Sequence, residues 1–422
     1  MIRTLFAPSP TGLLHIGNLR TALYAYALAR HSNGQFLLRI EDTDQKREEV
    51  GTTDAIKKTL TKFGLVWDEY YLQSERLSVY QKAAQKLLSE GHAFYCQCPP
   101  RNAKTDGFSQ ILRDPCRDKS FTSGAIKLKV PDGETISHFD FVHKKDISWD
   151  SNGVYDATLL KTDGFPTYHL AAMTDDIEMK ITHILRGHDW MPSTPIHLLV
   201  FKYLGGLRPE IGHLSDILNS QTGKKLSKRR DSVFAEQFLE EGYLPEALLN
   251  FVMLLGWAPK DNRETYTLEE FVQEFDINGF QESNPRFEDK KLKWFNGFYI
   301  RQKSDEELLS LIKPSVPEMT LEIIPLIKER INNLNEVKGL TNFFFIRPAP
   351  MPSVNMKEAY ELLKNVSWSK EGIETAIAGK DKSFYMDLRL AVCGQKITPP
   401  LTESMLILKK DETLARIHQS QA

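Results

Sequence analysis

The chain has 422 residues, 41% of them hydrophobic, which is enough to bury a large core and too many for one ordinary domain. Its formal net charge of -2 excludes nucleic-acid binding that rests on overall positive charge. The sequence has neither an apolar run near the ~18 residues of a membrane helix nor the apolar core of a secretory signal. We therefore expect a cytoplasmic protein without a membrane segment, with roughly two to four domains.

The first turn, residues 7–18 (APSPTGLLHIGN), joins an expected buried strand at 2–7 to an expected helix that begins near residue 19. A loop that leads a strand into a helix leaves backbone amides unpaired and exposes the positive end of the helix dipole, which suits a phosphate. His15 adds a side-chain donor, and Gly17 lets a ligand approach the backbone. A lone histidine at this place is more often a helix cap or a packed side chain than a catalytic group.

Residues 34–42 predict a second strand that ends at Glu41 and Asp42, and residues 52–64 and 76–90 predict amphipathic helices. Alternating strands and helices favour a doubly wound parallel sheet, an α/β fold whose ligands bind at the carboxyl ends of the strands. We therefore expect the first turn and Glu41 to meet there.

Short strand-like segments between residues 91 and 150 predict an insertion that splits this sheet. Sheet structure is expected to return over residues 158–179 and 181–190, followed by a helix near 194–204. The basic stretch 222–230 (TGKKLSKRR) follows a strand-like segment, although a basic run is by itself most often a solvated face. Beyond residue 231 the apolar spacing predicts mainly helices.

The HIGN and KLSKR stretches, in this order, resemble the two signature motifs of class I aminoacyl-tRNA synthetases. The sequences APSPTG, FLLRIEDTD, FPTYHLA, ILRGHDW and STPIH narrow the resemblance to the glutamyl-tRNA synthetase branch. The similarity continues to residues 386–401 and so covers most of the chain.

The resemblance implies a domain order of a split Rossmann-like catalytic domain at 1–90 and 151–230, an inserted acceptor-end-binding domain at 91–150, a helical stem-contact domain at 231–302 and a short helical anticodon-binding domain at 303–422. Its implied reaction attaches L-glutamate to tRNA(Glu) through a glutamyl-adenylate, with ATP and Mg²⁺. Charges balance in the last of these regions, so its role in tRNA binding follows from the resemblance alone. The family is commonly monomeric.

The resemblance also implies roles for particular residues. The catalytic set is His15, Asn18, Lys225 and Lys228. The ATP-binding set is Thr11, His15, Gly17, Asn18, Leu226, Ser227, Lys228 and Arg229. The glutamate-binding set is Ala7, Ser9, Glu41, Tyr168 and Arg186. Elementary chemistry agrees, because a carboxylate suits an ammonium group and an arginine fork suits a carboxylate.

Two positions depart from the family pattern. Leu5 stands where a basic residue is usual, which removes one expected partner of the substrate side-chain carboxylate; Arg3 is the candidate replacement, because alternate residues of a strand share a face. His188 stands where an acid is common, and it is either a pH-sensitive contact or a solvated side chain.

The four cysteines do not form a disulfide pattern, and Cys393 is expected to be packed. Some members of the family bind Zn²⁺ through two cysteines one residue apart, a later cysteine and a fourth ligand. Cys96, Cys98 and Cys116 match three of these, with Asp118 or His92 as candidates for the fourth. The alternative is a packed cluster without metal.

Four other functions remain open from the sequence. The enzyme could also charge tRNA(Gln), or it could attach glutamate to a modified base of tRNA, although relatives with that activity lack the helical region after residue 303. The chain could also be a related adenylate-forming enzyme acting on a small molecule. From a different class, it could be a catalytically weak paralogue that binds tRNA, with Leu5 as the distinguishing position.

Overall fold

The computed structural model describes residues 1–44, 49–99, 112–226 and 233–422. The chain divides into two compact units, which are described separately. The first contains Met1–Gln237 and Leu249–Glu288, and the second contains Phe238–Leu248 and Asp289–Ala422.

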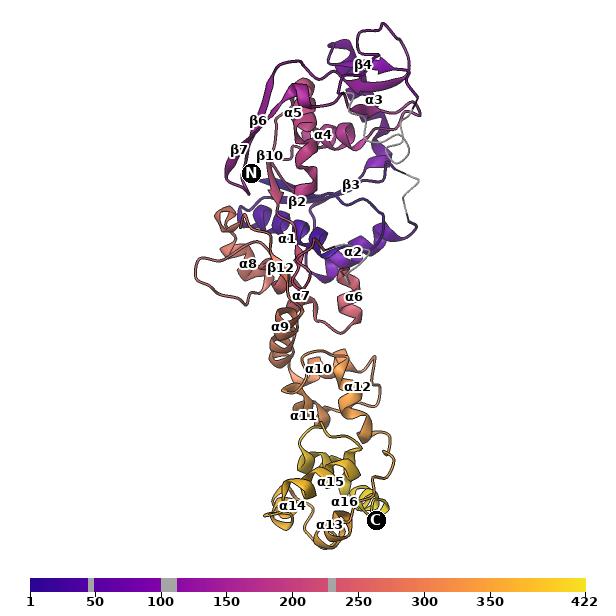
Figure 1. The fold of residues 1–422 in the computed structure, drawn as a ribbon, viewed down its shortest axis with the longest axis vertical. Coiled ribbons are helices and arrows are strands. Elements are labelled where there is room, and N and C mark those ends of the chain that lie inside the picture. Colours follow the sequence, from indigo (N-terminus) through magenta and orange to yellow (C-terminus); the bar gives the residue numbers. More distant parts are fainter. Residues whose placement is uncertain (45–48, 100–111, 227–232) are drawn as a thin grey trace. The chain divides into compact units, whose positions relative to one another are not determined.

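The first unit is built on parallel strands. β1 (Arg3–Phe6), β2 (Gln35–Ile40) and β3 (Glu69–Leu72) pair in parallel, with β2 in the centre, as the alternation of strands and helices predicts. The helix α1 (Ile16–His31) connects β1 to β2, and in Figure 1 it lies below β2. Strands β1 and β2 are almost fully buried, as is usual for the strands of a parallel sheet that is covered on both faces.

A second group of strands lies beside β1. β10 (Glu210–Leu214) pairs in parallel with β9 (His183–Gly187), and Thr182, next to β9, donates its backbone N–H to the carbonyl of Arg3 at 2.9 Å. The sheet continues through β6 (Thr135–Asp140) and β7 (Lys145–Asp150), an antiparallel pair attached to β10. Two strands of the expected insertion at 91–150 therefore extend this sheet.

Three further strands form a separate antiparallel sheet in the order β4 (Ala93–Cys96), β5 (Ala125–Leu128) and β8 (Thr158–Leu160). Thus the boundary between the two sheets does not coincide with residue 150. A one-dimensional pattern of strands cannot show this, because strand pairing joins segments that are distant in sequence.

Helices cover the parallel strands. The expected helices are present as α2 (Thr52–Lys62), α3 (Leu77–Ser89) and α5 (Thr194–Leu204). The expectation of sheet over residues 158–179 is wrong for its second half, because Tyr168–Glu178 is the helix α4. Its residues 170–176 are all buried, and burial on every side hides the helical period that an exposed helix shows. In Figure 1, α4 and α5 lie above β2.

The first unit is completed by β11 (Leu218–Asn219), α8 (Leu268–Glu274) and β12 (Arg286–Phe287). The helices α6 (Ala235–Glu240) and α7 (Pro245–Met253) each have residues in both units. The described part of the second unit is helical, as predicted: α9 (Asp289–Gln302), α10 (Asp305–Ile312), α11 (Ile324–Lys328), α12 (Glu336–Thr341), α13 (Asn355–Leu363), α14 (Lys370–Ala376), α15 (Lys382–Cys393) and α16 (Leu401–Gln419).

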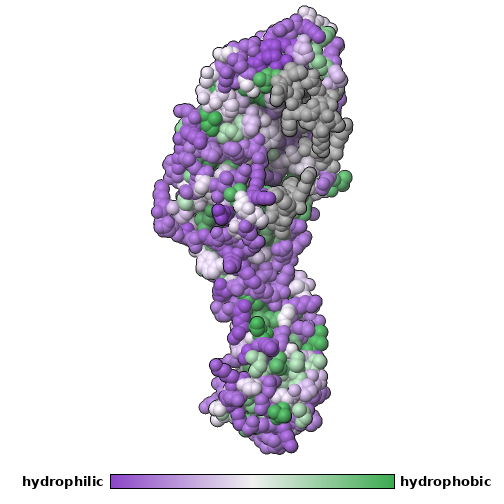
Figure 2. All heavy atoms as spheres, in the orientation of Figure 1, coloured by the Kyte–Doolittle hydropathy of each residue, from purple (hydrophilic) through white to green (hydrophobic). Residues whose placement is uncertain are grey.

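On the face seen in Figure 2, hydrophilic residues dominate the first unit, whereas hydrophobic residues are more frequent on the second. The exposed apolar side chains of the second unit include Ile346, Val354 and Ile397. None of the helices in the described ranges combines the length and hydrophobicity needed to cross a bilayer. The thiol of Cys393 is buried in the second unit, as expected.

Candidate functional site

The first turn delivers His15 to the start of α1. His15 is the N-cap residue of this helix, and its ring Nδ1 accepts the backbone N–H of Gly17 at 2.9 Å. A neutral ring with Nδ1 as acceptor carries its proton on Nε2, so His15 caps the helix through Nδ1 and has its N–H at Nε2. A Cβ at position 17 would lie 3.2 Å from Nδ1, so a side chain there would crowd the ring of His15.

The residues on both sides of the segment 227–232 are held by hydrogen bonds or ion pairs to other parts of the first unit. After this segment, Val233 accepts the backbone N–H of Ile16 at 2.8 Å, and the backbone N–H of Ala235 donates to Leu14 at 2.8 Å. Before it, Lys225 forms ion pairs with Asp189 at 2.5 Å and Asp216 at 2.9 Å. Backbone pairing therefore joins the first turn to the chain that follows the basic stretch.

Three predicted site residues, Ser227, Lys228 and Arg229, lie outside the described part of the chain. The residue before them, Leu226, is buried and donates its backbone N–H to the carbonyl of Ile217 at 2.9 Å.

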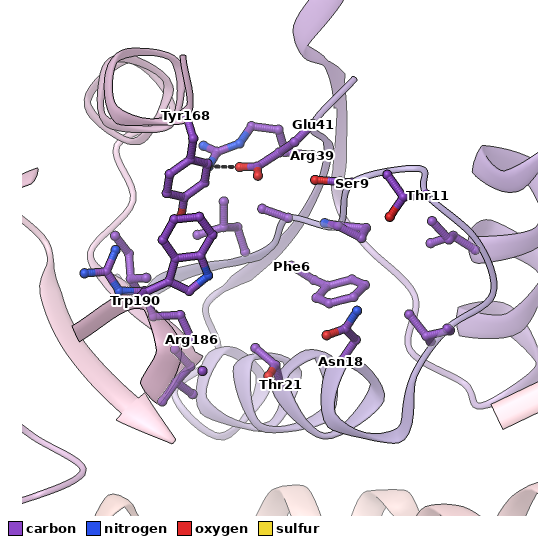
Figure 3. Close-up of a pocket in the computed structure, with 18 of the residues that line it drawn as sticks. Phe6, Ser9, Thr11, Asn18, Thr21, Arg39, Glu41, Tyr168, Arg186 and Trp190 are labelled. Carbon is purple, nitrogen blue, oxygen red and sulfur yellow. Dashed lines mark hydrogen bonds and ion pairs between the residues drawn. The ribbon is translucent and has the colours of Figure 1, made fainter. Parts of the chain in front are cut away.

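A cavity of about 280 Å³ opens at the carboxyl ends of β1, β2 and β9 (Figure 3). Seven predicted site residues line it: Ala7, Ser9, Thr11, Asn18, Glu41, Tyr168 and Arg186. His15, Gly17, Lys225 and Leu226 are absent from its lining. The backbone N–H of Glu41 donates to the carbonyl of Pro8 at 3.0 Å, so the end of β2 is fixed against the first turn.

One pole of this cavity is acidic. Arg39 is 2% exposed and pairs with Glu41 at 3.2 Å, with Asp176 at 2.7 Å and, more distantly, with Asp175 at 3.8 Å. Arg76 balances a second carboxylate by pairing with Asp175 at 2.8 Å. When Glu41 is ionised, three carboxylates against two guanidinium groups leave an excess negative charge next to the cavity, which suits the ammonium group of an amino acid.

The charge of Glu41 depends on pH near neutrality. Burial raises the pKa of its carboxyl group to about 7, against the opposing effect of Arg39. Since the raised pKa favours the protonated form of the empty site, the carboxylate that attracts an ammonium group forms as the pH rises through about 7.

We therefore expect the KM for the amino acid to fall several-fold between about pH 6 and pH 8, and the Glu41→Gln variant to lose this dependence. Amino-acid-dependent ATP–pyrophosphate exchange measured across this range tests the expectation. Glu69→Gln is the matched control, because Glu69 pairs with Arg3 and does not line the cavity. An unchanged slope in Glu41→Gln contradicts the assignment.

The other pole of the cavity is cationic. Arg186 is 6% exposed on β9, and its three nitrogens donate to His213, His197 and Thr194. Among the described residues, no carboxylate forms an ion pair with it. Its positive charge therefore remains available to an anionic group in the cavity.

Arg3 does not replace the basic residue that is missing at position 5. Its guanidinium group is bound by Glu69 at 3.0 Å, by Gln35 and by the carbonyl of Met179, and Arg3 does not line the cavity. Leu5 itself is buried and lines the cavity. Positions 3 and 5 lie on the same face of β1, but the side chain of Arg3 is directed by its hydrogen bonds to the carboxylate of Glu69.

Trp190 was not predicted as a site residue, although it ends the ILRGHDW sequence. Its ring stacks on Tyr168 with centroids 4.1 Å apart, and Figure 3 shows this pair beside Arg186. Arg39 and Asp176 were missed as well, although LRIEDTD and MTDDIEM carried the signal of charged residues within apolar elements. His188 is exposed and does not line the cavity.

The cysteine cluster contains a fourth donor that differs from both expected candidates. Ligand atoms of Cys96, Cys98, Cys116 and Asp114 lie within 4.8 Å of one another. The sulfurs of Cys98 and Cys116 are 3.5 Å apart, and the sulfur of Cys96 is 3.3 Å from an Asp114 oxygen.

Asp118 and His92 lie outside this cluster. The side chain of Asp118 is 86% exposed, and the ring of His92 stacks on Tyr203 with centroids 3.8 Å apart. A turn brings Asp114 back, because its carboxylate accepts the backbone N–H of Cys116 at 2.8 Å.

Comparisons with known proteins agree with this architecture. Residues 1–294 match the family model for tRNA synthetases class I (E and Q), catalytic domain, and residues 291–421 match the anticodon binding domain. The chain is 35% identical to the glutamate–tRNA ligase of Dehalococcoides mccartyi, covering 99% of this chain and 96% of that protein. The relative from Borreliella burgdorferi is also 35% identical, with 99% and 98% covered.

Solved structures give the same result. The crystal structure of a glutamate tRNA ligase from Elizabethkingia meningosepticum in complex with its amino acid has a TM-score of 0.89 and 32% identity, and 99% of each chain is covered. The glutamate–tRNA synthetase of Elizabethkingia anophelis has the same TM-score and coverage at 33% identity. The chain therefore belongs to the glutamate–tRNA ligase family of class I tRNA synthetases.

Proposed function

We propose that this chain attaches L-glutamate to tRNA(Glu) in two steps that consume ATP. The observation that carries the proposal is the cavity beside the first turn. Glu41 contributes a carboxylate to one end of this cavity, and Arg186, which has no carboxylate partner among the described residues, contributes a cation to the other. Such a site fits an amino acid that brings both an ammonium group and carboxylates.

In the first step a carboxylate oxygen of glutamate attacks the α-phosphorus of ATP, and pyrophosphate leaves. Positioning and charge neutralisation do most of the work in such a reaction. Glu41 and Ser9 hold the ammonium group, and Arg186 and Tyr168 hold carboxylate. The N–H of His15 at Nε2, the amides at the start of α1 and the lysines 225 and 228 contact the phosphates.

In the second step a ribose hydroxyl of the terminal adenosine of the tRNA attacks the acyl carbon of the adenylate, and AMP leaves. Mg²⁺ would accompany ATP, bound mainly by its phosphate oxygens and supplying further charge neutralisation. The inserted segment, the stem-contact region 231–302 and the helical region from 303 are proposed to contact the tRNA.

Charging assays with purified tRNA test this function. We expect labelled glutamate to be attached to tRNA(Glu) with ATP and Mg²⁺, and Lys228→Ala to reduce charging about 100-fold or more. Lys224→Ala, in the same basic stretch, is the matched control and is expected to have a small effect. Binding of tRNA without charging would show a catalytically weak paralogue instead.

The same assay with purified tRNA(Gln) decides whether the enzyme also charges that tRNA. Sedimentation equilibrium tests the proposed monomeric state.

We also propose that the cysteine cluster holds a structural Zn²⁺. Three thiol groups and one carboxylate lie close enough together for tetrahedral coordination, with Cys96, Cys98, Cys116 and Asp114 as ligands. We expect elemental analysis to find one equivalent of zinc, which the Cys98→Ser variant loses. Cys393→Ser, at a buried cysteine of the second unit, is expected to retain the metal. Metal-free wild-type protein would show that the cluster is only packed.

A further inference from the structure

The contacts of Arg186 are unusual for a buried arginine, because its hydrogen-bond acceptors among the described residues are neutral groups. Its Nε donates to Nε2 of His213 at 3.0 Å, Nη1 to Nδ1 of His197 at 2.9 Å and Nη2 to the hydroxyl oxygen of Thr194 at 2.8 Å. The three acceptors come from β10 and from the start of α5, and all are 0% exposed or nearly so. Together they fix the plane of the guanidinium group from three directions.

A second layer of hydrogen bonds orients these acceptors. Nδ1 of His213 lies 2.6 Å from Asp140 Oδ2, and Nε2 of His197 lies 2.9 Å from Nδ1 of His169. Because Arg186 can only donate, each histidine nitrogen facing it must be unprotonated, and the proton sits on the nitrogen that faces Asp140 or His169. Asp140 thereby selects the tautomer of His213 that accepts from Arg186.

Burial keeps these rings neutral. It lowers the pKa of His213 to about 4, despite the opposing effect of Asp140, and lowers the pKa of His197 well below its ordinary value. Burial also lowers the pKa of His169 to about 4. At neutral pH the groups around Arg186 therefore act as uncharged acceptors.

His213 and Asp140 also belong to a group of possible metal ligands, but this group does not suit a metal ion. Ligand atoms of His138, Asp140 and His213 lie within 4.8 Å of one another. A metal on Nδ1 of His213 would move the proton to Nε2, which would then face the Nε–H of Arg186, donor against donor. The observed contact with Arg186 therefore requires the metal-free arrangement.

The other buried arginine of the cavity shows what the neutral environment achieves. Arg39 is surrounded by Glu41, Asp175 and Asp176, so its charge is already balanced within the protein. A carboxylate beside Arg186 would balance that charge in the same way and would compete with an anionic ligand. Neutral acceptors supply direction without neutralising the charge.

We propose that His197, His213 and Thr194, with Asp140 behind them, are positioning residues that aim Arg186 through uncharged acceptors and so leave its charge to the carboxylate of the substrate. This inference rests on the proposed function, in which Arg186 binds glutamate. According to this inference, residues that contact Arg186 but do not line the cavity affect the affinity for the amino acid.

Two substitutions of His197 that are isosteric with each other test the proposal. His197→Asn keeps an uncharged oxygen near the position of Nδ1, whereas His197→Asp has the same size and adds a negative charge. We expect the KM for glutamate in ATP–pyrophosphate exchange to rise at least about tenfold more in the Asp variant than in the Asn variant, with the KM for ATP unchanged in both. Equal effects, or a lower KM in the Asp variant, would overturn the proposal.

The background variant Arg186→Gln separates this proposal from the proposed function. In that background the Asn and Asp variants are expected to have the same KM for glutamate, because the charge on which they act is gone. If Arg186→Gln by itself leaves that KM unchanged, the role of Arg186 in the proposed function fails. If Arg186→Gln raises the KM but the two His197 variants do not differ, the positioning role fails.

A second pair guards against a folding defect at position 197. Thr194→Asn and Thr194→Asp differ in the same way at the acceptor of Nη2, and the same tenfold difference is expected between them. Thermal unfolding of each variant shows which pair to compare.

Discussion

Arg186→Gln is expected to reduce kcat/KM for glutamate by a factor of about 100 to 1,000, which is the largest effect on activity that the structure predicts. The physical reason is that the substrate carboxylate would enter a desolvated cavity and find no cation to replace its lost hydration. Glutamine keeps a polar group on a shorter side chain, so the loss measures the charge, the reach and the bidentate geometry of the arginine. ATP–pyrophosphate exchange at varied glutamate concentration gives the result.

Arg3→Gln is the matched control for this experiment. Arg3, like Arg186, is an arginine on a strand of the first unit, but Glu69 already balances its charge, and it does not line the cavity. We therefore expect the KM for glutamate to stay within about twofold of the wild-type value. A large increase in Arg3→Gln, with little change in Arg186→Gln, would show that Arg3 replaces the basic residue missing at position 5.

Asp175→Asn is expected to have the largest effect on stability, about 3–5 kcal/mol for the first unit. Asp175 is 0% exposed, and its oxygens accept from Gln73 at 2.8 Å, from Tyr80 at 2.9 Å and from Arg76 at 2.8 Å. Every one of these partners is a donor. The side-chain NH2 group of an asparagine would face at least one of these donors, and the loss of the carboxylate would leave Arg39 and Arg76 with less compensating charge.

Hydrogen exchange followed by mass spectrometry tests this prediction without requiring two-state unfolding of a chain with two units. Peptides from α4 and β2 are expected to lose protection by a factor of about 100 or more. Asp132→Asn is the control, since Asp132 also pairs with two arginines, Arg113 and Arg117, but its side chain is 67% exposed. Similar protection in the Asp175 and Asp132 variants would show that burial of the ion pairs contributes little.

The sequence alone predicted the elements whose information is local. The first turn, the helices at 52–64 and 76–90, the helix at 194–204 and the parallel arrangement of the first strands all follow from apolar periodicity and from turn residues. Helix α4 was missed because burial on all sides leaves no polar face to set the period. The family resemblance supplied candidate residues that no periodicity could indicate, and seven of them line one cavity.

Tertiary structure decided which charges are balanced and which remain available. Arg3, Arg39 and Arg186 are alike in the sequence, yet Glu69 binds the first, three carboxylates surround the second, and uncharged acceptors hold the third. Likewise, folding places Asp114 beside the three cysteines, whereas the sequence indicated Asp118 or His92 as the fourth ligand. Periodicity reports which face of an element is buried, but the partner of a buried charge comes from a strand or helix far away in the sequence, and only folding brings the two within hydrogen-bonding distance.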